Sequence, residues 1–323
     1  MIFEYALEPE LAASWHDFQN ARYFKEKFGV GRGRLVSRYP KDWKARVWQA
    51  FDGSGLQRDS VEYQNGRKHL EALLTVLTKK MVVRGQPLCG DQWLGGAEKE
   101  HDRSPFHAIL ATANPRRNPA VVLGETIDEE TQPRWKAPSS HPVPRDAHQL
   151  AQLMSPMLRC ASTVIFVDPN FRPEEWRFRQ TLGAFLAAML EGRPGPPPHR
   201  VELQVDQDKY KYGGRDFKES CEKRLPELVP AAISLRIIRW KQRLGGQELH
   251  NRFVLTDIGG VSFGHGLDES YNRGSEDLVS RLDEGAYWHL WEQYASSPPA
   301  FDCEEPPLVI DGKAKIPNRR GVT

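Results

Sequence analysis

The stretch that decides the fold reads HNRFVLTD over residues 250–257 and continues as GGVSFG over residues 259–264. The first run is rich in residues that favour strands, and Gly259 and Gly260 supply a turn into a second short apolar run. A two-stranded hairpin is therefore predicted. Side chains two residues apart on a strand point to the same face, so His250 and Arg252 are predicted to reach one ligand together.

This pairing suits the cleavage of a phosphodiester. A neutral imidazole, as on His250, can attack phosphorus as a nucleophile, and a cation such as Arg252 can neutralise the phosphate oxygens. Asp257 falls at the end of the strand, before the turn, where we expect it to orient the hairpin or its partner histidine. These residues form the predicted catalytic set, and their chemistry needs neither a metal ion nor a cofactor.

The spacing His250-x-Arg252-x4-Asp257 resembles the HKD half-motif of the phospholipase D superfamily. The sequence departs from that motif in two places. Arg252 stands where the superfamily has lysine, and Gly264-His265-Gly266-Leu267 stands where it has Gly-Ser-x-Asn. The resemblance implies that Gly264 and His265 support the site, with His265 touching a phosphate in place of the serine or else stabilising the turn. It also implies a downstream acid that bonds the catalytic histidine, for which Asp277 fits best and Glu276 is its neighbour.

The resemblance covers residues 146–297, where predicted helices and strands alternate. Helices are predicted over 146–159, 174–190, 216–228 and 287–294, and strands over 163–167, 201–205, 235–240 and 278–282, besides the hairpin. The predicted fold class is α/β, a phospholipase D-like half domain with a mixed sheet flanked by helices. The alternative is an ordinary α/β domain whose His-x-Arg pair decorates an edge hairpin.

Length and composition set the outer limits of the interpretation. The chain has 323 residues, 39% hydrophobic and 27% charged, which is typical of a globular protein with about two domains. The predicted organisation is a basic, partly helical region (1–132) with a core helix at 60–83, a proline-rich linker (133–145), the half domain (146–297) and a tail (298–323) that is basic from Lys313 onward.

The sequence also predicts a compartment. No apolar run approaches the ~18 residues that span a bilayer, and no signal peptide is visible, so no membrane partner is expected. The four cysteines are far apart and form no Cys-x-x-Cys pair, which is typical of a reduced cytoplasmic protein. The histidines, cysteines and carboxylates show no metal-ligand spacing, so no zinc is expected.

A basic segment near the N-terminus predicts contact with nucleic acid. Between residues 22 and 48 nine basic residues stand against two acidic ones, with aromatic residues interleaved, although the whole chain carries a formal charge of only +2. Such a segment suits phosphate contacts and base stacking. The residues predicted to bind are Arg32, Arg34, Arg38, Lys41 and Lys44. The alternative is a solvated helix face whose aromatic residues belong to the core.

A phospholipase D-like reaction uses two histidines, and one half-motif supplies one of them. Residues 121–129 echo residues 261–269, which makes His107 a candidate from a decayed first half with Ile109 in place of the cation. The other route is a homodimer that brings two copies of His250 together.

The sequence therefore predicts a metal-independent phosphodiesterase or nuclease that acts on nucleic acid through a phosphohistidine intermediate. The alternative is a catalytically inactive phospholipase D-like subunit that binds nucleic acid or serves as a scaffold in a larger complex, such as one of antiviral defence, where such domains are common.

Overall fold

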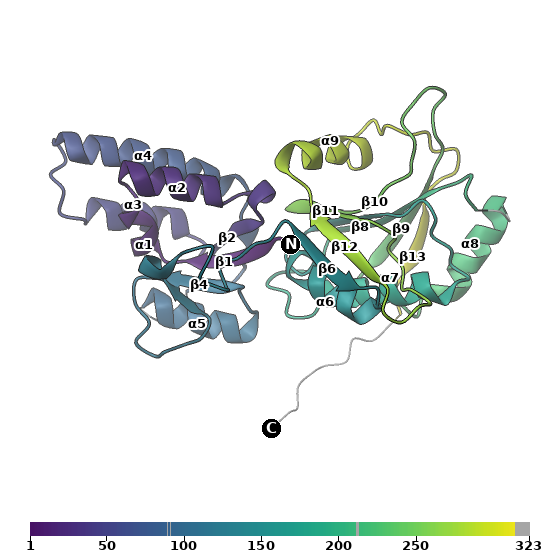
Figure 1. Ribbon diagram of the computed structural model, residues 1–323, viewed down its shortest axis with the longest axis horizontal. Coiled ribbons are helices and arrows are strands. Elements are labelled where there is room, and N and C mark those ends of the chain that lie inside the picture. The colour runs from purple at the N-terminus through teal and green to yellow at the C-terminus, as the bar shows by residue number, and fades with distance from the viewer. Residues whose placement is uncertain (89, 91, 211–212, 314–323) are drawn as a thin grey trace. The chain divides into compact units, whose positions relative to one another are not determined.

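The computed structural model describes residues 1–88, 90, 92–210 and 213–313. The chain divides into two compact units, each with its own sheet (Figure 1). Unit 1 comprises Met1–Ser139 with Gly192–Gly195, and unit 2 comprises Ser140–Glu191 with Pro196–Thr323.

Unit 1 is built on five parallel strands in the order β3-β2-β1-β4-β5. The strands are β1 (Phe3–Leu7), β2 (Arg34–Arg38), β3 (Val82–Val83), β4 (Ala108–Ala111) and β5 (Val121–Leu123). The helices are α1 (Pro9–Ser14), α2 (Phe18–Lys27), α3 (Trp43–Asp52), α4 (Val61–Lys79) and α5 (Trp93–Arg103).

Alternate residues of β1 belong to different apolar cores. Tyr5 and Leu7 pack into a cluster with residues of α1 to α4, whereas Ala6 packs into a second cluster with Trp93 and Ala97 of α5. The sheet is therefore covered on both faces, by α1 to α4 on one and by α5 on the other (Figure 1). The strands are short, and β3, β4 and β5 are apolar throughout without an alternating pattern, which is why the sequence predicted helices here but no strands.

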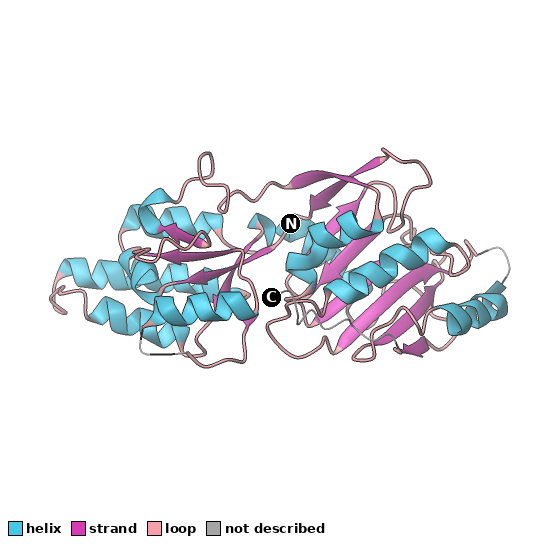
Figure 2. Ribbon diagram, turned by 90° about the horizontal axis from the view of Figure 1, so that it is seen from below, coloured by secondary structure: helices cyan, strands magenta, loops and turns pink. Residues whose placement is uncertain are grey.

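Unit 2 contains a mixed sheet of eight strands in the order β13-β9-β8-β7-β10-β11-β12-β6, and Figure 2 shows its strands with helices packed across them. The strands are β6 (Ser140–Pro144), β7 (Thr163–Val167), β8 (Arg200–Asp206), β9 (Ser234–Trp240), β10 (Arg252–Thr256), β11 (Gly259–Phe263), β12 (Glu276–Arg281) and β13 (Leu308–Asp311). The helices are α6 (Ala147–Leu158), α7 (Trp176–Ala188), α8 (Gly213–Arg224) and α9 (Glu284–Tyr294). Strands β7, β8 and β9 are parallel, and the remaining pairings are antiparallel.

The two faces of the unit 2 sheet are covered by different helices. The ring of Phe166 on β7 stacks on Phe185 of α7, with 5.6 Å between centroids. The neighbouring residues Ile165 and Val167 join a cluster that includes Leu290 of α9. The predicted α/β class, with a mixed sheet flanked by helices, is confirmed for this unit, and each helix and strand predicted over 146–297 is present.

Two segments that the sequence predicted to be irregular, the linker (133–145) and the tail (298–323), contain strands and buried side chains in the structure. The predicted linker (133–145) holds the boundary between the units, but Trp135 is fully buried in the core of unit 1 and residues 140–144 form β6. Because β6 is an edge strand, its prolines are tolerated there. The predicted tail contributes β13, which pairs with β9, while Phe301 is buried. The rest of the basic tail, residues 314–323, lies outside the described residues.

The two segments that echo each other in sequence differ in topology. Strands β10 and β11 form an antiparallel hairpin, whereas β4 and β5, at the matching place in unit 1, are parallel. A decayed copy of the hairpin would keep the antiparallel pairing, so the structure argues against a decayed first half in unit 1.

No helix within the described ranges has both the length and the apolar character that crossing a membrane requires.

Candidate functional site

Several loops of unit 2 meet at one edge of its sheet. Phe253 of β10 pairs with Val167 of β7 in antiparallel register, so Arg252 and Asp168 lie at the same edge. Arg252 also pairs with Phe263, which brings the segment after β11 to this edge. A cavity of about 350 Å³ opens here, lined by Arg145, Asp168, Asn170, Arg172, Arg177, Phe178, Arg252, His265, Gly266 and Asp268.

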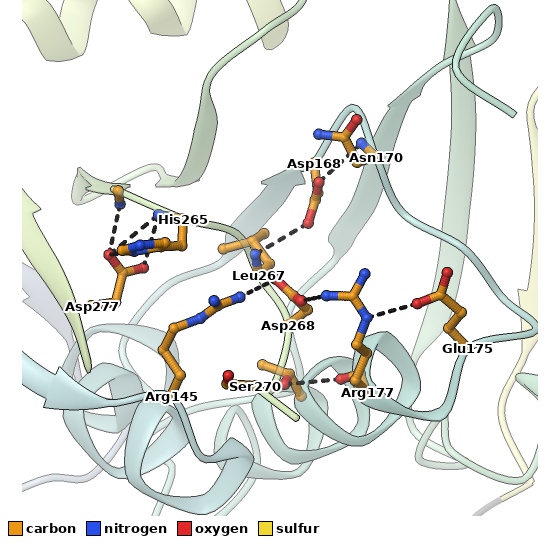
Figure 3. Close-up of polar contacts among 12 residues, drawn as sticks. Arg145, Asp168, Asn170, Glu175, Arg177, His265, Leu267, Asp268, Ser270 and Asp277 are labelled. Carbon is orange, nitrogen blue, oxygen red and sulfur yellow. Dashed lines mark hydrogen bonds and ion pairs between the residues drawn. The ribbon is translucent and has the colours of Figure 1, made fainter. Parts of the chain in front are cut away.

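Three of the four arginines are held by carboxylates. Asp268 is buried and accepts a hydrogen bond from Nη2 of Arg145 at 2.8 Å and another from Nη1 of Arg177. Glu175 accepts from Nε of Arg177 at 2.6 Å and from Nη1 of Arg172 at 2.9 Å. Figure 3 shows Arg145 and Arg177 converging on Asp268, with Glu175 beyond Arg177. These pairs fix the wall of the cavity and neutralise much of its charge.

Arg252 is the exception. No hydrogen bond or salt bridge joins its guanidinium to another residue of the described chain, and its buried Nε has no hydrogen-bond partner there. A buried donor without a partner is costly, at about 1–3 kcal/mol, so an arrangement of this kind favours a ligand that supplies the acceptor. Arginine presents its donors in a planar fork that matches a phosphate or a carboxylate.

Asp168 brings a titratable group to the same cavity. Its carboxylate is almost fully buried and accepts hydrogen bonds from the backbone N–H groups of Asn170 at 3.0 Å and Leu267 at 3.1 Å. The pKa of Asp168 is raised from 3.8 to about 6, mainly by burial and also by the nearby charge of Asp268, while the two hydrogen bonds and Arg252 oppose the shift. Near neutral pH, Asp168 can therefore both donate and accept a proton.

His265 is oriented by a buried carboxylate. Its Nδ1 lies 3.1 Å from Oδ1 of Asp277, which also accepts from the backbone N–H groups of Gly264 and His265 (Figure 3). A Cβ atom at Gly264 would lie 2.7 Å from that same oxygen, so a glycine is needed there. The imidazole is exposed, and the bond at Nδ1 leaves Nε2 available to a ligand. Asp277 therefore bonds a histidine, as the resemblance implied, but its partner is His265 and not His250.

His250 lies outside the cavity that Arg252 and His265 line. Strand β10 begins at Arg252, and His250 belongs to the exposed segment before it. It is not among the residues that line the cavity. The prediction that His250 and Arg252 share a strand face is therefore wrong for the histidine, because the regular alternation of side chains starts two residues later.

Asp257 lies at the opposite end of β10 from the cavity. Its Oδ1 accepts hydrogen bonds from the backbone N–H groups of Ser162 at 2.8 Å and Thr163 at 3.0 Å, where β7 begins. Five residues of extended chain place it about 17 Å from Arg252. Asp257 ties the hairpin to the start of β7, which agrees with the expected orienting role, and it lies outside the cavity.

His107 packs inside unit 1. Its ring stacks on Phe3, with 4.1 Å between centroids, and lies edge-on to Tyr5 at 5.3 Å. The carbonyl of His107 accepts a hydrogen bond from Arg134 at 2.8 Å. These contacts give His107 a role in packing next to β4.

The basic segment of unit 1 is largely structural. Arg34 is buried and bonds the carbonyl of Trp135 and the carboxylate of Glu129, so it is not available to a phosphate. The alternative interpretation holds for most of the interleaved aromatic residues, because Phe24, Phe28, Tyr39 and Trp43 are buried. Arg32 is exposed. Three predicted binding residues do gather around one cavity of about 390 Å³: Arg38, Lys41 and Lys44, with Thr78, Met81 and Val83.

No protein-family model and no curated protein matches this sequence. Within the residues that the structure describes, no group of three or more His, Cys, Asp or Glu side chains is placed to hold a metal ion.

Sequence reasoning missed Arg145, Asp168, Arg172, Arg177 and Asp268. Arg145 follows β6, whereas Arg172 and Arg177 lie just before and at the start of α7, and no recognised motif marks these positions. Asp168 did carry a signal, because an acidic residue directly after a buried strand lies at the edge of the sheet where ligands commonly bind.

Proposed function

We propose that this chain binds a phosphodiester of nucleic acid in the unit 2 cavity and hydrolyses it without a metal ion. The observation that carries the proposal is that one cavity is lined both by an arginine with free donors, Arg252, and by His265, which is oriented by the buried carboxylate of Asp277. The cavity residues themselves carry four arginines against two aspartates, a surplus of positive charge that favours an anionic ligand.

The residues would share the reaction as follows. The guanidinium of Arg252 binds the phosphate oxygens and stabilises the charge that develops on them. Nε2 of His265 attacks phosphorus, an N–P bond forms and the bond to the leaving oxygen breaks. Protonated Asp168 donates its proton to that oxygen. Water then attacks phosphorus, the N–P bond breaks, and the proton released by the water returns to Asp168.

In this proposal the nucleophile is His265, whereas the sequence predicted His250. The general acid is Asp168, so a second histidine is not needed. Asp168 has its pKa raised to about 6, so part of the population carries the required proton at neutral pH. In this scheme one chain is sufficient, and neither a homodimer of His250 sites nor His107 is required.

The second candidate function is phosphate binding without cleavage, in a nucleic-acid-binding or scaffold subunit. The observation in its favour is that the histidine of the degenerate motif, His250, lies outside the cavity. Three of the four arginines are also already paired with carboxylates.

The deciding experiment is a cleavage assay of the full chain on end-labelled single- and double-stranded DNA and RNA, with and without excess chelator. We expect cleavage that persists in chelator, and a labelled protein–nucleic acid adduct that survives denaturation but is lost in mild acid, as a phosphohistidine would be. His265→Ala should abolish cleavage but retain binding, and Arg252→Ala should weaken binding about tenfold or more.

His250→Ala is the matched control, because it removes an exposed imidazole outside the cavity, and it should behave as the wild type. Loss of activity in this variant alone would restore His250 as the nucleophile. Binding without cleavage by the wild type would select the second candidate, and activity that requires added magnesium would refute the mechanism.

A further inference from the structure

Two exposed aromatic side chains lie beside the cavity. Trp176, the first residue of α7, is 42% exposed, and Tyr271, in the segment between β11 and β12, is 64% exposed. Their ring centroids are 5.8 Å apart, with the planes at 75°. Large aromatic residues normally gain stability by burial, so an exposed pair beside a polar cavity is typical of a binding surface.

Arg177 links this pair to the cavity. It is one of the lining residues, and its guanidinium carbon lies 5.3 Å from the centroid of the Tyr271 ring. Arg177, which directly follows Trp176, is therefore part of the cavity wall, and its guanidinium also contacts the ring of Tyr271. A ligand whose phosphate lies in the cavity can reach the aromatic surface with a group attached to that phosphate.

The segment that carries Tyr271 is anchored on both sides of the cavity. The backbone N–H of Glu269 donates to the carbonyl of Arg177 at 3.3 Å, and that of Ser270 donates to the carbonyl of Arg145 at 2.9 Å. Asp268, just before them, is held by the side chains of the same two arginines. Tyr271 is thus presented by a fixed segment, and little conformational entropy is lost when a ligand stacks on it.

We propose that Tyr271 and Trp176 form a stacking platform for an unpaired base, so that the substrate is single-stranded nucleic acid. This inference rests on the proposed function, since the neighbouring phosphate would occupy the cavity at Arg252. A flat, uncharged base stacks on an aromatic face, whereas in a duplex the faces of the bases are already occupied by their neighbours. The positive cavity and the apolar platform match the two chemical parts of a nucleotide.

The test is the affinity of the full chain for three fluorescein-labelled ligands, measured by fluorescence anisotropy: a thymidine oligonucleotide, the same strand with abasic sites, and the corresponding duplex. We expect the single strand with bases to bind most tightly. Tyr271→Ala should weaken its binding about 5- to 150-fold, since one base stacked on an aromatic residue contributes about that much. The same variant should change the affinity for the abasic strand little.

Two control variants keep the test specific. Tyr271→Phe retains the ring and should bind as the wild type. Phe18→Ala removes a ring from unit 1 that is 60% exposed and also makes an edge contact, with His69 at 5.5 Å, yet it should leave the affinity unchanged. Thermal melting of each variant should show that the fold is retained.

The outcomes separate the two proposals. Equal affinity for the normal and abasic strands, an unchanged affinity in Tyr271→Ala, or tighter binding of the duplex would overturn the platform and leave the phosphate site standing. If none of the three ligands binds, the proposed function itself fails.

Discussion

Asp257→Ala should destabilise unit 2 without affecting ligand binding. The carboxylate accepts two backbone hydrogen bonds, from Ser162 and Thr163, which tie the end of the hairpin to the start of β7. A hydrogen bond to a charged group contributes about 1.5–3 kcal/mol, but Asp257 is partly exposed and water replaces part of each bond. The expected loss is therefore about 2 kcal/mol in the free energy of unfolding.

For a unit of this size, that loss corresponds to a fall in Tm of roughly 4–8 °C, which thermal melting followed by circular dichroism can measure. Asp257→Asn keeps an acceptor oxygen in the same place and should lose less than half as much. Because Asp257 lies about 17 Å along the strand from Arg252, the affinity for a single-stranded oligonucleotide should be unchanged in both variants at a temperature where they are folded. An unaltered Tm in Asp257→Ala, or a loss of affinity in the folded variant, would refute this account of the residue.

Two further perturbations act on the cavity itself. Gly264→Ala should reduce cleavage at least tenfold and lower the free energy of unfolding by about 1–3 kcal/mol. The reason is that its Cβ would displace the Asp277 carboxylate that orients His265. Full activity of this variant in a cleavage assay would contradict the orienting role of Asp277. Asp168 should make stability depend on pH. Its pKa is raised on folding, so its favourable contribution is fully present below pH 3.8 and is lost as the pH rises through about 6. Asp168→Asn has no proton to lose, so the difference in Tm between the wild type and this variant should favour the wild type more at pH 5 than at pH 8, and a constant difference would argue against the raised pKa.

The sequence predicted the architecture of unit 2 well because its elements have clear local signals. The apolar runs at 163–167 and 235–240 are separated by stretches of helical periodicity, and such alternation specifies an α/β arrangement. Unit 1 was less legible. Strand β3 has two residues and β5 has three, and their pairing with distant neighbours depends on tertiary packing that leaves no periodic pattern.

The candidate site was predicted only in part. The His-x-Arg pattern led to the edge of the sheet where the cavity opens, since Arg252 lines it, but His250 precedes the regular strand and the histidine that lines the cavity is His265. The resemblance to the half-motif led to Asp277 as the acid that bonds a histidine, but the structure pairs it with His265, which depends on how the segment after β11 turns. Arg172 and Arg177 share the nearby Glu175, but the contacts of Arg145 and Arg177 with Asp268 span 123 and 91 residues, and such long-range contacts leave no local pattern in the sequence.

Asp268 reduces the expected dependence of nucleic-acid affinity on ionic strength. A protein cation that neutralises a phosphate of a single strand releases roughly 0.7 of a condensed counterion, and that release is what makes affinity fall as salt is added. Arg145 and Arg177 already have Asp268 as their counterion, and Arg172 has Glu175. Asp268 and Glu175 balance two of the four cavity arginines, and ionised Asp168 balances a third near neutral pH, so the affinity of this arginine-rich cavity should vary with salt as though it held one positive charge.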